Sequence, residues 1–449
     1  MASTYLQRTA GTSTENYKYT FSAWVKRTGV LGSSSVNEVL FSNWSNDTNS
    51  AYIRFEDQND NLQVFDKYGS TIDLNYQTNM KFRDCNSFYH IVVNVDGTRS
   101  ANQRCKIYVN GSEVSCSNTT DTGGTLAMKT VTATNAMRAG AIKTSGGTEY
   151  YFSGILSHVH YIDGTGYDAS YFGETDSTTG EWKIKTSPTG ITYGTNGFFI
   201  LKDGNTITDQ SSNSNDFTLG AGTLTKTEDC PSNVFATFNP LHPGLTLFSN
   251  VNFLNGNTTF DNNETGGSIY PIAKSTLAAS QGKYYAEFKQ NESDGGLGIS
   301  DGKSDENFLG DNTSNGVHYR SDGNVRVNNA ESSFGDTYTT GDIIGIAMDL
   351  DNNYVYFSKN GTWQDSGDPT SGASGTGGIS IPTSSTGVFH FAATEIGSSS
   401  TSNMSANFGN GYFGTTAVAS AGTNASGNGI FEFDVPNGFT ALSTKGLNL

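Results

Sequence analysis

The chain has 449 residues, a formal net charge of −17 and 53 glycines, and only 15% of its residues are charged. Typical globular domains carry roughly 25% charged residues, so neutral polar groups keep this chain in solution, as in turn-rich all-β proteins. The negative charge and the lack of a basic cluster exclude the usual nucleic-acid binders, which need Lys and Arg for phosphate contacts.

The length predicts two domains, each with its own hydrophobic core. No stretch of about 18 consecutive apolar residues is present, so we expect no membrane insertion. Residues 1–20 lack the basic start and the apolar run of a signal peptide. We therefore expect synthesis in a cytoplasm.

Short alternating segments dominate the N-terminal part of the chain. The run YTFSAWVK at residues 19–26 alternates its apolar side chains, as expected for a strand with one buried face. Further segments of this kind follow at the spacing of antiparallel strands: residues 39–44, 51–55, 62–65 and 89–95. The pattern predicts an antiparallel β-sandwich.

The four cysteines are too few for a disulfide scaffold in a chain of this length. In CKIYVNGSEVSC, Asn110 and Gly111 predict a two-residue hairpin turn that puts Cys105 opposite Cys116. The pair falls at a hydrogen-bonded position, which is the less usual one for a cross-strand disulfide. We therefore expect buried free thiols.

Three segments of this part resemble the laminin-G and concanavalin-A-like lectin group. They are TFSAWVK at residues 20–26, the hairpin at 106–114, and FSGILSHVHYIDG at 152–164. The resemblance covers about residues 3–170 and implies a jelly-roll sandwich, so we assign residues 1–170 to a first domain. Members of the group often bind calcium, which keeps calcium open as a cofactor, and we expect no other.

Two histidines have a spacing that metal sites use. His158 and His160 point to the same face of a predicted strand. The same pattern fits a polar outer face with Val159 turned inward, and we favour that interpretation.

Acidic loops supply the oxygen ligands that calcium prefers. One candidate loop holds Asp301, Asp305, Glu306 and Asp311. In the lectin-like domain, the candidates are Asp47, Asp57 and Asp60. The spacing matches no twelve-residue calcium loop, so solvated acidic turns are the favoured interpretation.

Residues 171–244 separate the two predicted sandwiches. Short strand-like pieces there lie among Ser, Asn and Thr residues. We predict a semi-ordered connector that packs on the first domain.

The best-specified stretch is GDIIGIAMDLDNNYVYFSKNGTW at residues 341–363. Both faces of its first run, residues 343–350, are apolar, which predicts a central strand covered on both sides. Asp351 to Asn353 supply a turn, residues 354–357 return as a partner strand, and Asn360-Gly361 turns again. The stretch predicts an antiparallel meander.

This meander resembles the core of a SPRY domain. GKYYAEF at residues 282–288 resembles an early strand of that family, and NFG at 407–409 resembles its closing strand. The resemblance covers about residues 245–415, which we assign to a second domain. It implies a bent β-sandwich that binds protein partners through its end loops and has no catalytic machinery.

Residues 416–449 form the predicted C-terminal region. Gly, Ala, Ser and Thr dominate as far as residue 429, which predicts a flexible stretch. Residues 430–435 alternate as a last strand before a Pro-Asn-Gly turn. We expect this strand to serve as an ordered attachment element.

No catalytic constellation emerges from the residues, so we expect no enzymatic activity. Hydrolases of the lectin-like group carry their carboxylates on one strand as E-x-D-x-E, and this string is absent. Trp44 and Trp363 lie in predicted turns and could stack on sugar rings. The alternative for each tryptophan is a lid on its own core, and this is the commoner role.

Taken over nearly its whole length, the chain resembles large structural proteins of tailed bacteriophages. The resemblance rests on FGETD at residues 172–176, YGTNGF at 193–198, ATFNP at 236–240 and the tail at 431–449, set around the two sandwiches. The fold class predicted is all-β, with a concanavalin-A-like jelly roll and a SPRY-like sandwich joined by a semi-ordered connector.

The resemblance implies a virion decoration or fibre protein, displayed on the capsid or tail after synthesis in the bacterial cytoplasm. We expect weak, multivalent binding to host surface polysaccharide, contact with other virion proteins, and homo-oligomers. A purely architectural virion protein is the alternative. A polysaccharide depolymerase is a third possibility, disfavoured by the missing carboxylates.

Overall fold

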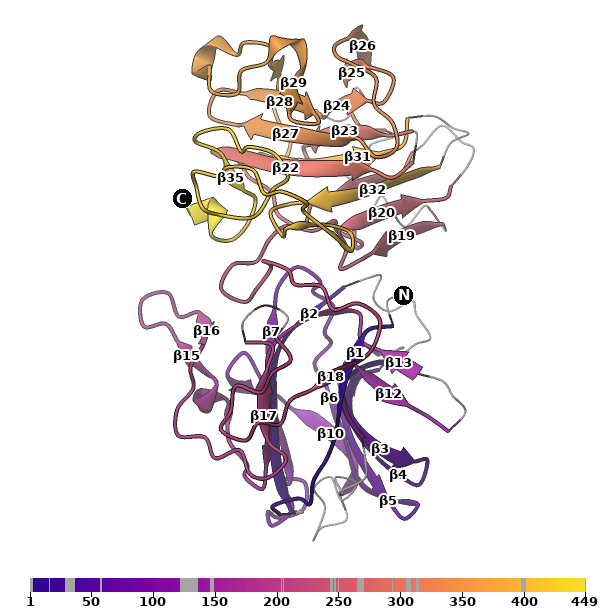
Figure 1. Cartoon of the computed structure of the whole chain (residues 1–449), viewed down its shortest axis with the longest axis vertical. Helices are drawn as coiled ribbons and strands as arrows, with labels where there is room; N and C mark the ends of the chain where they lie inside the picture. Colours follow the sequence, from indigo (N-terminus) through magenta and orange to yellow (C-terminus); the bar gives the residue numbers. More distant parts are fainter. Residues whose placement is uncertain are drawn as a thin grey trace. The chain divides into compact units, whose positions relative to one another are not determined.

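The computed structural model describes residues 3–448 except 16, 29–36, 57–58, 122–135, 146–148, 203, 205, 243–244, 246–247, 249, 265–269, 293, 304–307, 312–314 and 397–400. The chain forms two compact units, Met1–Lys226 and Thr227–Leu449 (Figure 1). Their described elements are strands and a few short 3-10 helices, which confirms the all-β prediction. Among these elements, no helix is long and apolar enough to cross a membrane.

Unit 1 is a sandwich of two antiparallel sheets. Sheet 1 has the order β10 (Cys116–Asp121), β6 (Thr71–Thr78), β5 (Leu62–Tyr68), β4 (Asn49–Phe55), β3 (Glu38–Asn46), β11 (Ala136–Ala139), β1 (Tyr5–Thr9), β18 (Thr218–Ala221). Sheet 2 has the order β17 (Phe198–Ile200), β14 (Gly154–Asp163), β2 (Lys18–Arg27), β7 (Tyr89–Asp96), β8 (Cys105–Val109), β9 (Ser112–Glu113). The five strands predicted for this part are therefore present as β2, β3, β4, β5 and β7.

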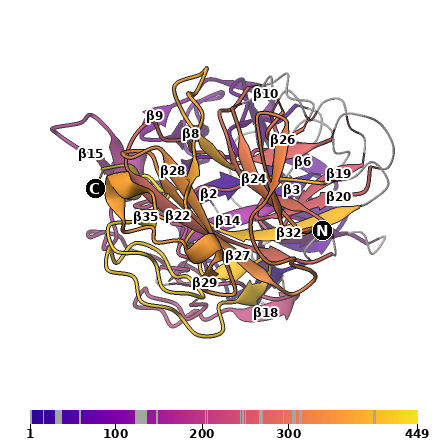
Figure 2. The same ribbon diagram turned by 90° about the horizontal axis from the view of Figure 1, so that it is seen from above.

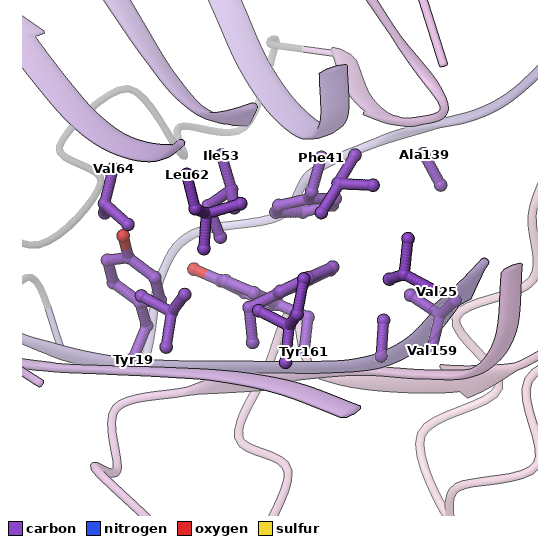
Figure 3. Close-up of a cluster of buried hydrophobic side chains, with 14 of the residues drawn as sticks. Tyr19, Val25, Phe41, Ile53, Leu62, Val64, Ala139, Val159 and Tyr161 are labelled. Carbon is purple, nitrogen blue, oxygen red and sulfur yellow. The ribbon is translucent and has the colours of Figure 1, made fainter. Parts of the chain in front are cut away.

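One hydrophobic core lies between the two sheets, because alternate residues of each strand point to the same side. Phe41 and Val64 of sheet 1 face Tyr19 and Tyr161 of sheet 2 (Figure 3). All four side chains are at most 1% exposed. The outward side chains of sheet 1, such as Tyr52 and Arg54, take no part in this core.

The chain after β14 continues to pack on unit 1 as far as Lys226, within the range 171–244 where a semi-ordered connector packed on the first domain was predicted. Trp182, in the hairpin of β15 (Gly173–Thr175) and β16 (Trp182–Ile184), donates its indole N–H to Nδ1 of His90 at 2.9 Å. Its ring lies against Gly111 and Gly173, where an added Cβ would come within about 2.5 Å of ring carbons. The rest of the predicted connector, from Thr227, belongs to unit 2, where Phe238 packs in the core.

The predicted opposition of Cys105 and Cys116 is wrong. The hairpin does turn at Asn110 and Gly111, but its pairing ends once Val114 has bonded to Ile107. The chain then crosses to the other sheet, where Cys116 pairs with Thr78 of β6. Both thiols are free, Cys105 is buried and Cys116 is half-buried. The crossover from sheet 2 to sheet 1 depends on contacts between residues far apart in the chain, which the Asn-Gly turn does not specify.

Unit 2 is also built on two large sheets (Figures 1 and 2). Sheet 3 has the order β19 (Val251–Leu254), β20 (Thr259–Asn262), β32 (Ser402–Asn407), β22 (Lys283–Gln290), β27 (Ile343–Asp349), β28 (Tyr354–Lys359), β29 (Thr362–Trp363), with β35 (Thr440–Ala441) beside β22 and β30 (Ile379–Ser380) beside β28. Sheet 4 has the order β21 (Ile272–Lys274), β31 (His390–Thr394), β23 (Gly296–Ser300), β24 (Val317–Arg320), β25 (Asn324–Val327), β26 (Ala330–Ser333).

The prediction of a central strand at residues 343–350 is confirmed. β27 lies between β22 and β28, and both of its faces are buried. Ile346 packs in the main core of unit 2, while Ala347 packs in a second apolar cluster with Tyr285 and Phe431 on the other face. The apolar character of both sides of this strand follows from that double covering.

The C-terminal region differs from the prediction. Residues 430–435 form no strand in a sheet but lie on the outer face of sheet 3, with Phe431 only 1% exposed. The stretch expected to be flexible is ordered against them, since Gly422 donates its N–H to the Phe431 carbonyl and Val435 donates to that of Thr423. Paired backbone groups, rather than composition, decide the structure of this stretch.

Candidate functional site

The outer face of sheet 1 is the candidate binding surface. Because β4 turns Ile53 inward, Tyr52 and Arg54 point away from the core. The strand register then sets their neighbours, since Tyr52 pairs with Phe65 and Arg54 pairs with Gln63 on β5. The resulting face combines aromatic rings with amide and guanidinium groups.

Two aromatic rings form a flat surface on this face. Tyr52 and Phe65 stack with ring centroids 4.7 Å apart and planes 9° apart. The guanidinium of Arg54 lies over the Tyr52 ring at 4.6 Å, and burial raises the pKa of the Tyr52 hydroxyl. Flat, half-buried rings of this kind can stack on the apolar face of a sugar.

A line of polar side chains runs beside the rings. Arg54 donates Nε–H to the side-chain oxygen of Gln63 at 2.7 Å, and Gln63 donates its amide N–H to Asn75 at 2.8 Å. At the end of β4, Glu56 accepts from the amide of Gln77 and lies 3.6 Å from Arg54. These bonds fix the positions of the polar groups before any ligand arrives, which lowers the entropy cost of binding.

Trp44 lies on the same face, in β3, where it pairs with Ser50. Its side chain is half-buried. In the following turn, hydrogen bonds from the hydroxyl and backbone N–H of Ser145 hold the pKa of Asp47 below its ordinary value. Trp44 is thus a diagonal neighbour of Tyr52, and the structure places it on the face that the aromatic pair occupies.

Trp363 packs as a lid on the core of its own unit, which was the alternative to a sugar-binding role. It belongs to unit 2, where its half-buried ring meets that of Tyr285 edge-on at 6.4 Å and packs on the cluster that contains Phe431. The residue covers its own core. Trp44 and Trp363 belong to different units, and Trp44 is the one that shares a face with the stacked pair of Tyr52 and Phe65.

His158 and His160 are not exposed on a polar surface. Val159 between them is buried in the core, as predicted. On the other side, both histidine rings contact Phe199, with the His160 ring 3.8 Å from it, and Tyr193 bonds to Nδ1 of His160 at 2.9 Å. Burial lowers the pKa of His160 well below its ordinary value. The pair is part of the packing between sheet 2 and the following segment.

Three of the acidic candidates for calcium, Asp47, Asp60 and Asp301, are bonded to protein donors. Asp60 bonds to Arg27 and Arg83, and Asp301 accepts from the backbone and hydroxyl of Ser385. Asp47 is bonded as above, and Asp57, Asp305 and Glu306 lie outside the described residues. Asp311 is buried, at 2% exposed. Within the described part of the chain, no group of three or more His, Cys, Asp and Glu side chains is placed to hold a metal ion.

The aromatic pair was missed by sequence reasoning although a signal was present. In AYIRF the inward positions are Ala51, Ile53 and Phe55, so the tyrosine between them must face outward. The contact with Phe65 depends on the register between β4 and β5, which alternation does not specify.

Comparison with known proteins supports the lectin-like prediction. Residues 1–165 match the family of the concanavalin A-like lectin/glucanases superfamily, within the range expected from the sequence. Unit 1 has a concanavalin A-like lectin fold. No curated protein matches the chain.

Solved structures with similar folds include SPRY domains. The SPRY domain of human HERC1 is 16% identical and covers 38% of this chain and 96% of its own, with a TM-score of 0.28. A protein from Bacteroides ovatus, described as carbohydrate-binding, is 15% identical and covers 50% of this chain and 58% of its own, with a TM-score of 0.35. These likenesses concern the fold alone.

Proposed function

We propose that the protein binds glycans through the outer face of sheet 1. The carrying observation is the stacked pair of Tyr52 and Phe65, with Trp44 beside it and the bonded line from Arg54 to Asn75 along its edge. Rings supply stacking surface, and amide groups supply hydrogen bonds to hydroxyls. The match of residues 1–165 to a superfamily that includes lectins supports this assignment.

A single face of this kind binds weakly, since two stacked rings and a short line of polar groups offer a sugar few contacts. We propose that the protein is displayed in many copies on a tailed-bacteriophage particle, as homo-oligomers on the capsid or tail. Many copies raise the avidity by roughly 10² to 10⁴ without new contacts. The virion assignment rests on the sequence resemblance over nearly the whole chain, and it gives unit 2 the role of contacting other virion proteins.

We propose binding without hydrolysis. Glycosidases need two carboxyl groups about 5 to 9 Å apart on either side of the scissile bond. Glu56, next to this face, is engaged by Gln77 and Arg54, and the sequence has no E-x-D-x-E string. These observations disfavour a depolymerase.

The test uses full-length protein, free and clustered on beads, with polysaccharide from a host cell envelope. We expect millimolar binding by free protein, much tighter retention by clustered protein, and no change in polymer size on long incubation. Trp44→Ala and Tyr52→Ala should each lower retention, and Trp363→Ala, the control in unit 2, should not. Release of reducing ends would identify an enzyme, whereas no retention by clustered protein would favour the architectural alternative.

A further inference from the structure

Arg138 also lies on the outer face of sheet 1, beside the residues described above. It lies in β11, where the register pairs it with Gln7 on one side and Ser42 on the other. Its neighbour Met137 is in the core, so Arg138 points to the same face as Trp44 and Tyr52. The residue is nevertheless only 8% exposed.

The buried guanidinium has no anionic partner among the described residues. Its Nε is sealed from solvent and makes no hydrogen bond there. The other arginines of unit 1 each meet a carboxylate or a side-chain amide: Arg8 with Asn215, Arg27 and Arg83 with Asp60, Arg54 with Glu56, Arg99 with Asp96, and Arg104 with Asp121. Arg138 is the exception in the described part of the unit.

This exception has an energetic meaning. A guanidinium stays charged at all relevant pH values, so it cannot escape burial by losing its proton. A buried donor without an acceptor, such as Nε of Arg138, is costly, and natural sequences avoid it unless the group has a use.

The guanidinium lies over the ring of Tyr5. Its carbon lies 5.4 Å from the centre of the Tyr5 ring, and Tyr151 of the β12 (Ala141–Lys143) and β13 (Glu149–Tyr151) hairpin lies 6.2 Å from Tyr5. On β18, Gly220 makes room for the Tyr5 ring, because an added Cβ would lie 2.1 Å from a ring carbon. The planar group is thus framed before any ligand arrives.

We propose that Arg138 binds an anionic group, a carboxylate or a sulfate, of an acidic polysaccharide. This inference rests on the proposed glycan binding and names the class of glycan. A planar guanidinium fits two oxygens of such a group side by side. Arg138 is a diagonal neighbour of Trp44 through the pair of Ala136 and Trp44, at about 7–8 Å between their backbones, so the charge lies beside the aromatic surface.

The test compares three polymers on beads that carry clustered full-length protein. The polymers are polygalacturonate, dextran sulfate and neutral dextran. For Arg138→Gln we expect at least about a tenfold loss of retention of the preferred acidic polymer, since a charge-assisted pair is lost, with dextran unchanged. The polymer that loses more retention identifies the group as carboxylate or sulfate. The control Arg83→Gln removes an equal charge from a side chain that is 62% exposed, and it should retain wild-type binding.

Thermal unfolding separates a ligand role from a structural one. Removal of a buried donor that has no acceptor should leave the unfolding temperature of Arg138→Gln unchanged or raise it. A lower unfolding temperature would show that contacts within the protein stabilise the guanidinium without a ligand, and it would overturn the proposal. Equal retention of acidic polymer by wild type and Arg138→Gln would also overturn it, while leaving glycan binding intact. If wild type retained none of the three polymers or the host polysaccharide, the proposed function itself would fail.

Discussion

Glu287 fastens the C-terminal segment to unit 2, so its replacement should loosen that segment. The residue lies in β22 and is 0% exposed. Its carboxylate accepts the backbone N–H groups of Glu432 and Phe433, each at 2.8 Å, the hydroxyl of Tyr285 at 3.1 Å, and the amide of Asn407 at 3.4 Å. Two backbone donors of the segment therefore depend on one side chain.

The magnitude follows from those two donors. A buried donor left without an acceptor costs about 1–3 kcal/mol, so Glu287→Ala should destabilise unit 2 by about 2–6 kcal/mol. Glu287→Gln keeps one acceptor and should cost about 1–3 kcal/mol. The control Glu331→Gln affects an exposed ion pair with Arg320 and should cost about 1 kcal/mol or less.

Thermal unfolding and limited proteolysis of residues 411–435 are the assays. We expect lower unfolding temperatures and faster cleavage of this segment in both Glu287 variants, with Glu287→Ala more severe. Unchanged unfolding and cleavage in Glu287→Ala would refute the role of the carboxylate as a fastener.

The same residue predicts a pH dependence. Burial, the largest effect, raises the pKa of Glu287 to about 7, although hydrogen bonds from Glu432 and Phe433 oppose the rise. The folded chain thus binds a proton that the unfolded chain releases at its lower pKa, so this contribution to stability is complete below the unfolded pKa and is lost as the pH rises through about 7. Burial also raises the pKa of Glu395 to about 7, so the test is the difference between wild type and Glu287→Gln across this range.

Three further predictions concern the fold. Ile346→Asp should destabilise unit 2 by several kcal/mol, because it places an unpaired charge in a strand buried on both faces, and an unchanged thermal transition would contradict this. Trp182→Ala should lower the free energy of unfolding of unit 1 by about 2–4 kcal/mol and expose residues 171–226 to protease, since the hydrogen bond and ring contact with His90 are lost. If the variant resists protease as well as wild type does, this packing is refuted. Limited proteolysis of wild type should give fragments that meet near residue 226, and rapid cleavage within β27 would contradict the division into two units.

Alternation alone placed many of the strands. In β2 and β4 the side-chain direction reverses at every residue, so the pattern of apolar residues reports which side faces the core. The same rule found Val159 inward between two histidines. The apolar residues on both faces at 343–350 correctly indicated a strand that is covered on both faces. Only such a strand buries apolar side chains on either face.

Turn chemistry was equally local. Asn110-Gly111 and Asn360-Gly361 both have positive φ at their two central positions, as a tight hairpin turn requires. These residues adopt that backbone at little cost, so the dipeptide itself carries the signal. The dipeptide does not specify how far the hairpin extends. After Val114 the chain crosses to the other sheet, where Cys116 pairs with Thr78.

The candidate site was decided by the tertiary structure. Tyr52 meets Phe65, and Arg138 lies beside Trp44, only because four strands pair in one register, and register depends on contacts between residues far apart in the chain. The composition of the C-terminal stretch predicted flexibility, yet its backbone groups find partners in residues 431–435 and its neighbours bond to Glu287. Local pattern determines which way a side chain points, whereas the long-range packing determines what it meets.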